Sequence, residues 1–166
     1  MATTTHGNLT VTASGDDGQR RLQLRGRLDE SVVGLVAHAP AWHAATVVLD
    51  SGGVEAINSI GIREWMHLVA ALAAGGARVV HERCAEVLVE QMCFIPAVRG
   101  GGQVRSFHAP YHCDGCDREA SVLIDVETHQ AALAAMTAPP ATCATCGQPM
   151  ALADVPERSF AFLADR

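Results

Sequence analysis

The stretch of sequence that decides the fold is residues 46–75, TVVLDSGGVEAINSIGIREWMHLVAALAAG. It begins with an unbroken apolar run at residues 47–49 that ends at Asp50, and so short a run predicts a buried strand over residues 46–50. Glycines and an asparagine follow and indicate a loop. From residue 60 to residue 74 the apolar side chains recur every three or four positions, which predicts an amphipathic helix. The apolar positions of this helix are Ile62, Trp65, Met66, Val69, Leu72 and Ala73.

Ser59 stands where the predicted loop becomes the predicted helix. The first turn of a helix has unpaired backbone N–H groups and the positive end of the helix dipole, so a phosphate there lies in a favourable field. A serine at this place is also a common N-cap, whose hydroxyl accepts hydrogen bonds from the same N–H groups. From local physics alone, the N-cap is the interpretation that we favour.

Outside this stretch, glycines and prolines divide the chain into alternating strands and helices. A hairpin turn at residues 15–18 joins two strands, Gly75-Gly76 ends the central helix, and Pro96 ends the next one. Residues 1–7 are expected to be a frayed tail. The predicted order is β-β-α-β-α-β-α-β, with strands at residues 9–13, 22–26, 46–50, 77–80 and 104–107 and helices at residues 29–39, 60–74 and 84–95. We therefore expect an α/β fold, a sheet covered by helices, over residues 1–108.

The composition excludes several classes of function. All twelve basic residues are arginine, so mechanisms that need a lysine in a Walker motif, on a kinase strand or in a Schiff base are absent. The formal net charge of −6 argues against binding to nucleic-acid phosphates. The sequence holds no Ser/His/Asp set, paired carboxylates or glycine-rich phosphate loop at motif spacing. We therefore predict that the protein is not an enzyme.

The hydrophobic content predicts a packed soluble chain. Hydrophobic residues make up 49% of the sequence, but no apolar run approaches the ~18 residues that cross a bilayer. The first ten residues, MATTTHGNLT, have neither a basic nor an apolar region, so no signal peptide is expected. We expect a cytoplasmic protein that does not insert directly into a membrane.

Four of the six cysteines form two Cys-x-x-Cys pairs, at residues 113–116 and 143–146. Each pair places two thiolates on one side of a tight turn, so the two pairs supply four corners of a tetrahedral metal site. The 26 residues between the pairs exceed the usual spacing of about 15–20, but they contain an apolar, hairpin-like insert. A redox dithiol or two disulfides are the alternatives. We predict a structural zinc with no open position for catalysis, and its ligands are Cys113, Cys116, Cys143 and Cys146.

The cysteine pairs belong to a second, small module at residues 109–166, which resembles a zinc ribbon. This module carries a net charge of −5 against −1 for residues 1–108, which again argues against nucleic acid. A strand is expected at residues 121–124, and the alternation of Phe160 and Phe162 with smaller residues suggests a last strand. Outside the pairs, Cys84 and Cys93 are predicted to pack as small core residues.

The first module resembles a STAS domain, the fold of bacterial anti-sigma-factor antagonists. Residues 22–31, LQLRGRLDES, are similar to the family's strand ending in Gly-x-Leu-Asp. Residues 47–62, VVLDSGGVEAINSIGI, are similar to its strand, valine-bearing loop and Asp-Ser-x-Gly helix start. Residues 77–80 fit the next strand. The resemblance extends over residues 8–108 and implies a mixed sheet with covering helices.

In this family an anti-sigma kinase phosphorylates the serine of Asp-Ser-x-Gly, and the phosphate breaks the complex with that kinase. Ser59 and Gly61 match this motif, while Asn58 stands in place of the aspartate. The resemblance implies a signalling adaptor that binds a protein partner around the helix start, with Ser59 as the candidate phosphorylation site. The candidate partner-binding residues are Asn58, Ser59, Gly61, Arg63, Glu64 and His67.

Two other functions stay open. Some STAS branches act without this phosphorylation, including the subunit bound to an ABC ATPase in lipid-transport complexes, and Asn58 favours that alternative. A zinc-dependent redox sensor is the third. The expected partner is therefore an anti-sigma or serine kinase-like protein or an ABC ATPase, and association with a second copy of the chain stays open.

Overall fold

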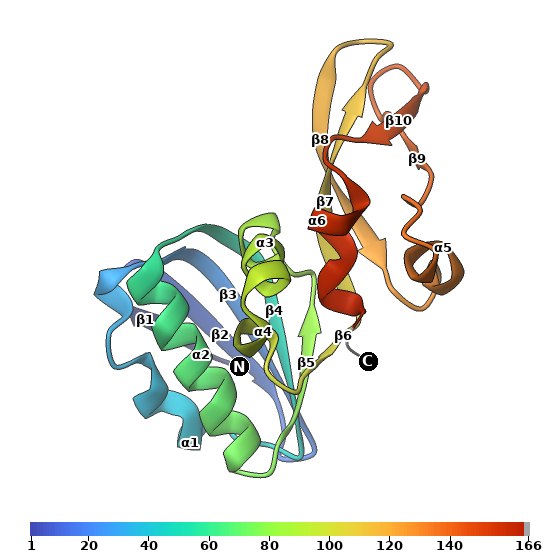
Figure 1. The fold of residues 1–166 in the computed structure, drawn as a ribbon. Helices are drawn as coiled ribbons and strands as arrows, with labels where there is room; N and C mark the ends of the chain where they lie inside the picture. Colours follow the sequence, from blue (N-terminus) through green and yellow to red (C-terminus); the bar gives the residue numbers. More distant parts are fainter. Residues whose placement is uncertain (165–166) are drawn as a thin grey trace.

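The computed structural model describes residues 1–164, which form two sheets with helices around them (Figure 1). The larger sheet has six strands in the order β1-β2-β3-β4-β5-β6. Neighbours from β1 to β3 pair antiparallel, and neighbours from β3 to β6 pair parallel. The predicted α/β fold with a mixed sheet is therefore confirmed. Its strands are β1 (Ala2–His6), β2 (Leu9–Gly15), β3 (Gln19–Leu28), β4 (Thr46–Ile57), β5 (Arg78–Glu82) and β6 (Gln103–Val104).

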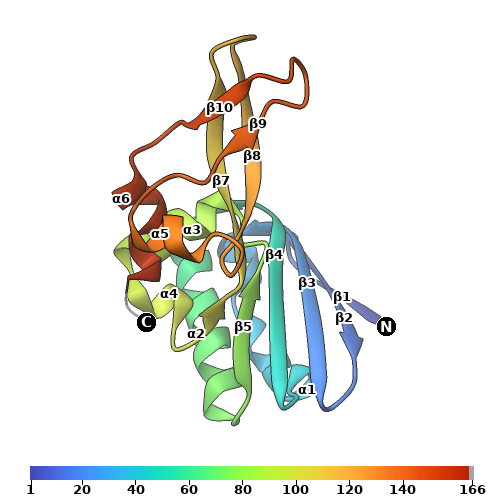
Figure 2. The ribbon, with the colours of Figure 1, turned by 90° about the vertical axis from the view of Figure 1, so that its right-hand side faces the viewer.

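The helices of the first module cover one face of this sheet (Figure 2). The longest, α2 (Ser59–Ala74), follows β4 directly and packs on β3, β4 and β5. Trp65 anchors α2, because its side chain is fully buried and its Nε1 donates to the Val98 carbonyl at 2.8 Å. The others are η1 (Glu30–Val32), η2 (Leu35–His38), α1 (Ala39–Trp42), α3 (Glu86–Phe94) and α4 (Pro96–Arg99).

The N-terminal residues are a strand, and the prediction of a frayed tail is wrong. β1 pairs with β2 through a two-residue turn in which Gly7 has φ of 59°. Tight hairpin turns of this kind need positive φ, which glycine adopts at little cost. Residues 2–6 are mostly threonine on an exposed edge, so they lack the apolar alternation that marks a half-buried strand.

The segment predicted as a loop after Asp50 is also a strand. β4 continues to Ile57 because register shifts absorb extra residues in its pairing with β3. A Cβ on Gly53 would lie 2.5 Å from Cγ of Arg25, so the absence of a side chain lets the two strands approach. A glycine that serves close strand packing has the same local signature as a glycine in a turn.

The predicted helix at residues 29–39 forms only the 3₁₀ turns η1 and η2, and the short helix α1 begins where that helix was expected to end. Gly34 separates η1 from η2 with φ of 88°, which an α-helix does not contain.

The smaller sheet has four antiparallel strands in the order β8-β7-β10-β9. β7 and β8 form a long hairpin that rises away from the first module (Figure 1). The elements of the second module are β7 (Ser106–Cys113), β8 (Arg118–Asp125), α5 (Gln130–Ala134), β9 (Ala141–Thr142), β10 (Pro149–Leu152), α6 (Pro156–Phe160) and η3 (Ala161–Leu163).

The two modules share one hydrophobic core. β7 runs without a break through residues 108 and 109, where we placed the boundary. The expected last strand is instead α6 and η3, which return to the first module. Phe160 and Phe162 pack their rings on Phe107 at centroid distances of 5.9 and 5.1 Å. Since both phenylalanines cover one aromatic ring, a helical turn satisfies the pattern that suggested a strand.

Candidate helix-start surface and metal centre

Asn58, and not Ser59, caps α2. Its side-chain Oδ1 accepts hydrogen bonds from the backbone N–H groups of Ile60 at 3.1 Å and Gly61 at 2.9 Å. The N-cap interpretation of Ser59 is therefore wrong by one residue. Ser59 is the first residue of the helix and is exposed.

The amide of Asn58 also explains why an aspartate is absent there. Its Nδ2 donates to Glu30 Oε2 at 2.7 Å. An aspartate at residue 58 has no donor for this bond and would bring two carboxylates together. Glu30 is exposed, and nothing in its local sequence pointed to this role.

Gly61 lies in the contact between α2 and β3. A Cβ at this residue would be 1.8 Å from the Leu28 carbonyl oxygen and 2.2 Å from its carbon. The glycine of the motif therefore serves close packing of the helix on the strand. Because Gly61 is buried, a partner has no direct access to it.

Glu64 is buried, although we expected it on the exposed face of α2. Its carboxylate accepts from the Gly34 backbone N–H at 2.9 Å, which holds the pKa of Glu64 below its ordinary value. Its other oxygen lies 3.3 Å from Arg63 and 3.9 Å from His67. One carboxylate thus links the loop after η1 to two exposed side chains of the helix.

The exposed residues around this point form what we call the helix-start surface: Glu30, Val33, Asn58, Ser59, Arg63 and His67. Ser59, Arg63 and His67 are four residues apart in turn, so they make one stripe along α2. Val33 is 56% exposed and precedes Gly34, whose backbone N–H is held by Glu64. The sequence pointed to the stripe but gave no sign of Val33, whose place depends on the bond between Gly34 and Glu64.

The four cysteines of the two pairs come together at the far end of the second module. Each pair occupies a turn between antiparallel strands, one between β7 and β8 and the other between β9 and β10. The residue after each pair has positive φ, 53° at Asp117 and 73° at Gly147. Both turns therefore end on a residue in the left-handed region, and Gly147 N–H closes its turn on the Cys143 carbonyl at 2.9 Å.

The spacing of the sulfurs fits a tetrahedral metal ion. All four Sγ atoms lie within 4.8 Å of one another. The shortest contacts are 3.5 Å between Cys113 and Cys146 and 3.6 Å between Cys116 and Cys143. Zinc bound at about 2.3 Å from each sulfur places the sulfurs about 3.8 Å apart. The predicted ligands are therefore gathered as a metal requires, and four thiolates are a donor set of zinc.

The electrostatics of the cluster also suit a cation. Backbone N–H groups of Cys146 and Thr145 lower the pKa of Cys143 to about 6. Burial and the neighbouring thiols raise the pKa of Cys116 to about 12. Four thiolates repel one another at this distance unless a positive charge lies among them.

His112, beside Cys113, is not aimed at the cluster. Its Nδ1 lies 3.1 Å from Asp114 and its Nε2 lies 3.0 Å from Asp117.

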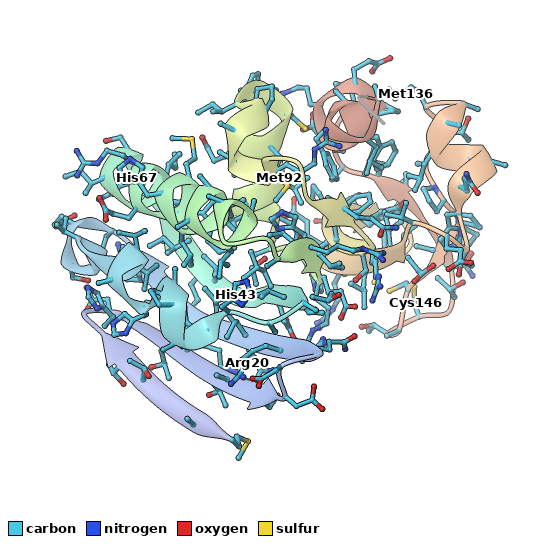
Figure 3. The ribbon with its side chains drawn as sticks, turned by 90° about the horizontal axis from the view of Figure 1, so that it is seen from below. Arg20, His43, His67, Met92, Met136 and Cys146 are labelled. Carbon is cyan, nitrogen blue, oxygen red and sulfur yellow. The ribbon has the colours of Figure 1, made fainter. Side chains whose placement is uncertain are left out.

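The helix-start surface and the cysteine cluster are far apart. Figure 3 shows His67 and Cys146 on opposite sides of the molecule. Among residues 1–164, no helix is long and apolar enough to cross a membrane. Comparisons of the chain with protein-family models, curated proteins and solved structures returned no match.

Proposed function

We propose that this protein is a non-enzymatic adaptor of the STAS type that binds a protein partner through the helix-start surface. The observation that supports it most is the exposed Val33 beside the stripe of Ser59, Arg63 and His67. An apolar centre with a polar rim is the usual composition of a protein interface. The order of β3, β4 and α2, with a capped and exposed helix start, agrees with the resemblance to STAS domains.

The position of Glu64 supports a prepared surface. A buried carboxylate that accepts from Gly34 fixes the loop bearing Val33 against α2. Less conformational entropy is then lost when a partner binds, because the loop is already ordered.

For an anti-sigma-type partner, phosphorylation of Ser59 is the proposed switch that breaks the complex. The phosphate adds about −1.5 to −2 charges, and it would lie one residue from the bond between Asn58 and Glu30. The repulsion from Glu30 favours the second candidate function, an unphosphorylated STAS subunit of an ABC-type transport ATPase.

The metal centre is proposed to hold one structural zinc in a zinc-ribbon-like module. All four corners are cysteine, so the ion has no open position, and its bonds hold β9 and β10 against the β7–β8 hairpin. Native mass spectrometry tests this directly. We expect one zinc per chain, and a chelator should remove both the zinc and the pairing of β10 with β7 and β9. A chain without bound metal and with disulfides would contradict the proposal.

The adaptor function is tested by affinity purification from the native cell with wild type, Val33→Asp and Arg118→Asp. Arg118 is exposed and begins β8 in the second module, and its variant changes the charge by more than Val33→Asp does, so it controls for added negative charge. We expect Val33→Asp alone to lose an anti-sigma or serine kinase-like protein, or an ABC ATPase. If that partner binds all three chains equally, the surface is assigned wrongly.

The identity of the partner separates the two candidate functions. With a kinase-like partner, Ser59→Asp should bind much more weakly than wild type. With an ABC ATPase, Ser59→Asp should bind as wild type does.

A further inference from the structure

Helices cover one face of the large sheet, and the other face is turned away from them (Figure 2). That other face carries an arginine cluster that neither the helix-start surface nor the metal centre uses. Arg21 on β3, Arg83 after β5 and Arg105 after β6 surround two carboxylates, Asp50 and Glu82. These residues come from four segments that the sheet brings side by side, so no local sequence motif marks the cluster.

The floor of the cluster is apolar. Val48 lies opposite Arg21 on β3 and opposite Val80 on β5. Both valines are fully buried, yet they lie outside the core that packs against the helices. They point to the other face because side chains alternate along a strand. The aliphatic part of an arginine covers such a floor while its guanidinium faces water.

Asp50 is the anchor of the cluster. Its Oδ2 accepts from Arg21 Nη2 at 3.1 Å and from Arg83 Nη2 at 2.6 Å. Its Oδ1 accepts from Arg83 Nε at 3.0 Å and from the Gly52 N–H at 3.4 Å. The side chain is only 1% exposed. Since its acceptor sites are filled by the protein, Asp50 fixes two guanidinium groups in place.

Glu82 brings in the third guanidinium. Its Oε2 lies 2.7 Å from Arg21 Nη1, and its Oε1 lies 3.2 Å from Arg105 Nη1. Arg21 and Arg83 share one Asp50 oxygen at 3.1 and 2.6 Å, so their Nη2 atoms are at most 5.7 Å apart. Three positive groups therefore crowd around two negative ones, and one positive charge is left over.

The three arginines still have donors for a ligand. Their side chains are 38%, 42% and 42% exposed for Arg21, Arg83 and Arg105. Each guanidinium has five N–H groups, and the hydrogen bonds to Asp50 and Glu82 use at most two on each. Arg83 also has φ of 47°, a costly conformation for an arginine that its two bonds to Asp50 hold in place.

We infer that Arg21, Arg83 and Arg105 bind a phosphoryl group, either as inorganic phosphate or on a small phosphomonoester. A tetrahedral dianion offers oxygens in several directions, and ordered guanidinium groups from different strands match that better than a planar carboxylate does. Arg105 also lines a cavity of about 720 Å³ at the junction of the modules, whose other charged lining residues are Arg99, Asp125 and Glu127. The organic part of a phosphomonoester would have room there.

The test is a titration of the full, zinc-loaded chain with inorganic phosphate at constant ionic strength, followed by the ¹⁵Nε–¹H signals of arginine. The arginine signals of wild type should reach a plateau as phosphate is added, and sulfate should compete with phosphate for the site. Arg105→Gln should weaken phosphate binding at least tenfold. This variant leaves Glu82 paired with Arg21 and Asp50 untouched, so the fold should survive, as thermal unfolding can check.

Arg78→Gln is the matched control. Arg78 lies on the same sheet face but pairs with the Gln103 amide, so its loss removes the same charge outside the cluster. Its affinity for phosphate should stay within twofold of wild type. Equal weakening of phosphate binding by both variants would overturn the site. Signals that move with phosphate only as they do with chloride, without reaching a plateau, would also overturn it. A parallel titration with glycerol 2-phosphate distinguishes inorganic phosphate from a phosphomonoester as the ligand. Tighter binding of glycerol 2-phosphate than of inorganic phosphate identifies a phosphomonoester.

Discussion

Replacing Gly61 with alanine should destabilise the protein although alanine is the better helix former. The added Cβ would lie 1.8 Å from the Leu28 carbonyl oxygen, and real Cβ contacts essentially never fall below 3.0 Å. The helix must therefore move from β3 by at least the 1.2 Å between these two distances. The obstacle is backbone on a central strand, so no side chain can turn aside to relieve it.

The magnitude follows from two opposing effects. Overpacking a closely packed contact costs about 1–3 kcal/mol, and this clash with backbone belongs at the upper end. The gain in helix propensity returns ~1 kcal/mol. The net loss is therefore about 2 kcal/mol, which lowers Tm by about 4–8 °C for a chain of this size.

Thermal and urea unfolding of Gly61→Ala and Gly101→Ala measure the effect. Gly101 is the control because a Cβ there meets nothing within 4 Å and its φ is not in the left-handed region. Gly61→Ala should be about 2 kcal/mol less stable than Gly101→Ala. Equal stability of the two variants would refute the packing explanation for this glycine.

Three further predictions concern the metal, the pH and the helix cap. Cys143→Ser should abolish stoichiometric zinc binding, whereas Cys93→Ser, in a cysteine outside the cluster, should keep it; native mass spectrometry reads both. Burial lowers the pKa of His81 to about 4, so below its ordinary value of 6.5 only the unfolded chain gains that proton. His81 should therefore lower stability by about 1 kcal/mol from pH 7 to pH 5.5, and urea unfolding of His81→Gln should lack this loss. Asn58→Asp keeps the cap oxygen but sets a carboxylate against Glu30, so it should cost about 1 kcal/mol at pH 7, and Glu30→Gln should restore most of it in a double-mutant cycle.

The sequence predicted the parts of the fold that local patterns govern. The buried run before Asp50 and the three- and four-residue spacing in α2 were enough for a strand and a helix. The two Cys-x-x-Cys pairs marked the cluster because both halves of each pair are local. β1 and the second half of β4 were missed, since both depend on pairing with neighbouring strands and not on their own periodicity.

The helix-start surface could be predicted from the sequence only in part, for the same reason. The serine at the helix start and the exposed stripe follow from helical spacing. The cap at Asn58, its bond to Glu30 and the burial of Glu64 depend on the loop after β3, which is distant in sequence. The arginines around Asp50 come from separate strands, so only the assembled sheet brings them together.

The most direct test of the adaptor hypothesis is site-specific photo-crosslinking in the native cell. A photoreactive residue at position 63, on the helix-start surface, is compared with one at position 118, on the exposed end of β8. We expect position 63 to capture one major protein, an anti-sigma or serine kinase-like protein or an ABC ATPase, and position 118 to capture none of it. The same captured protein at both positions, or no specific adduct at position 63, would contradict the proposed function.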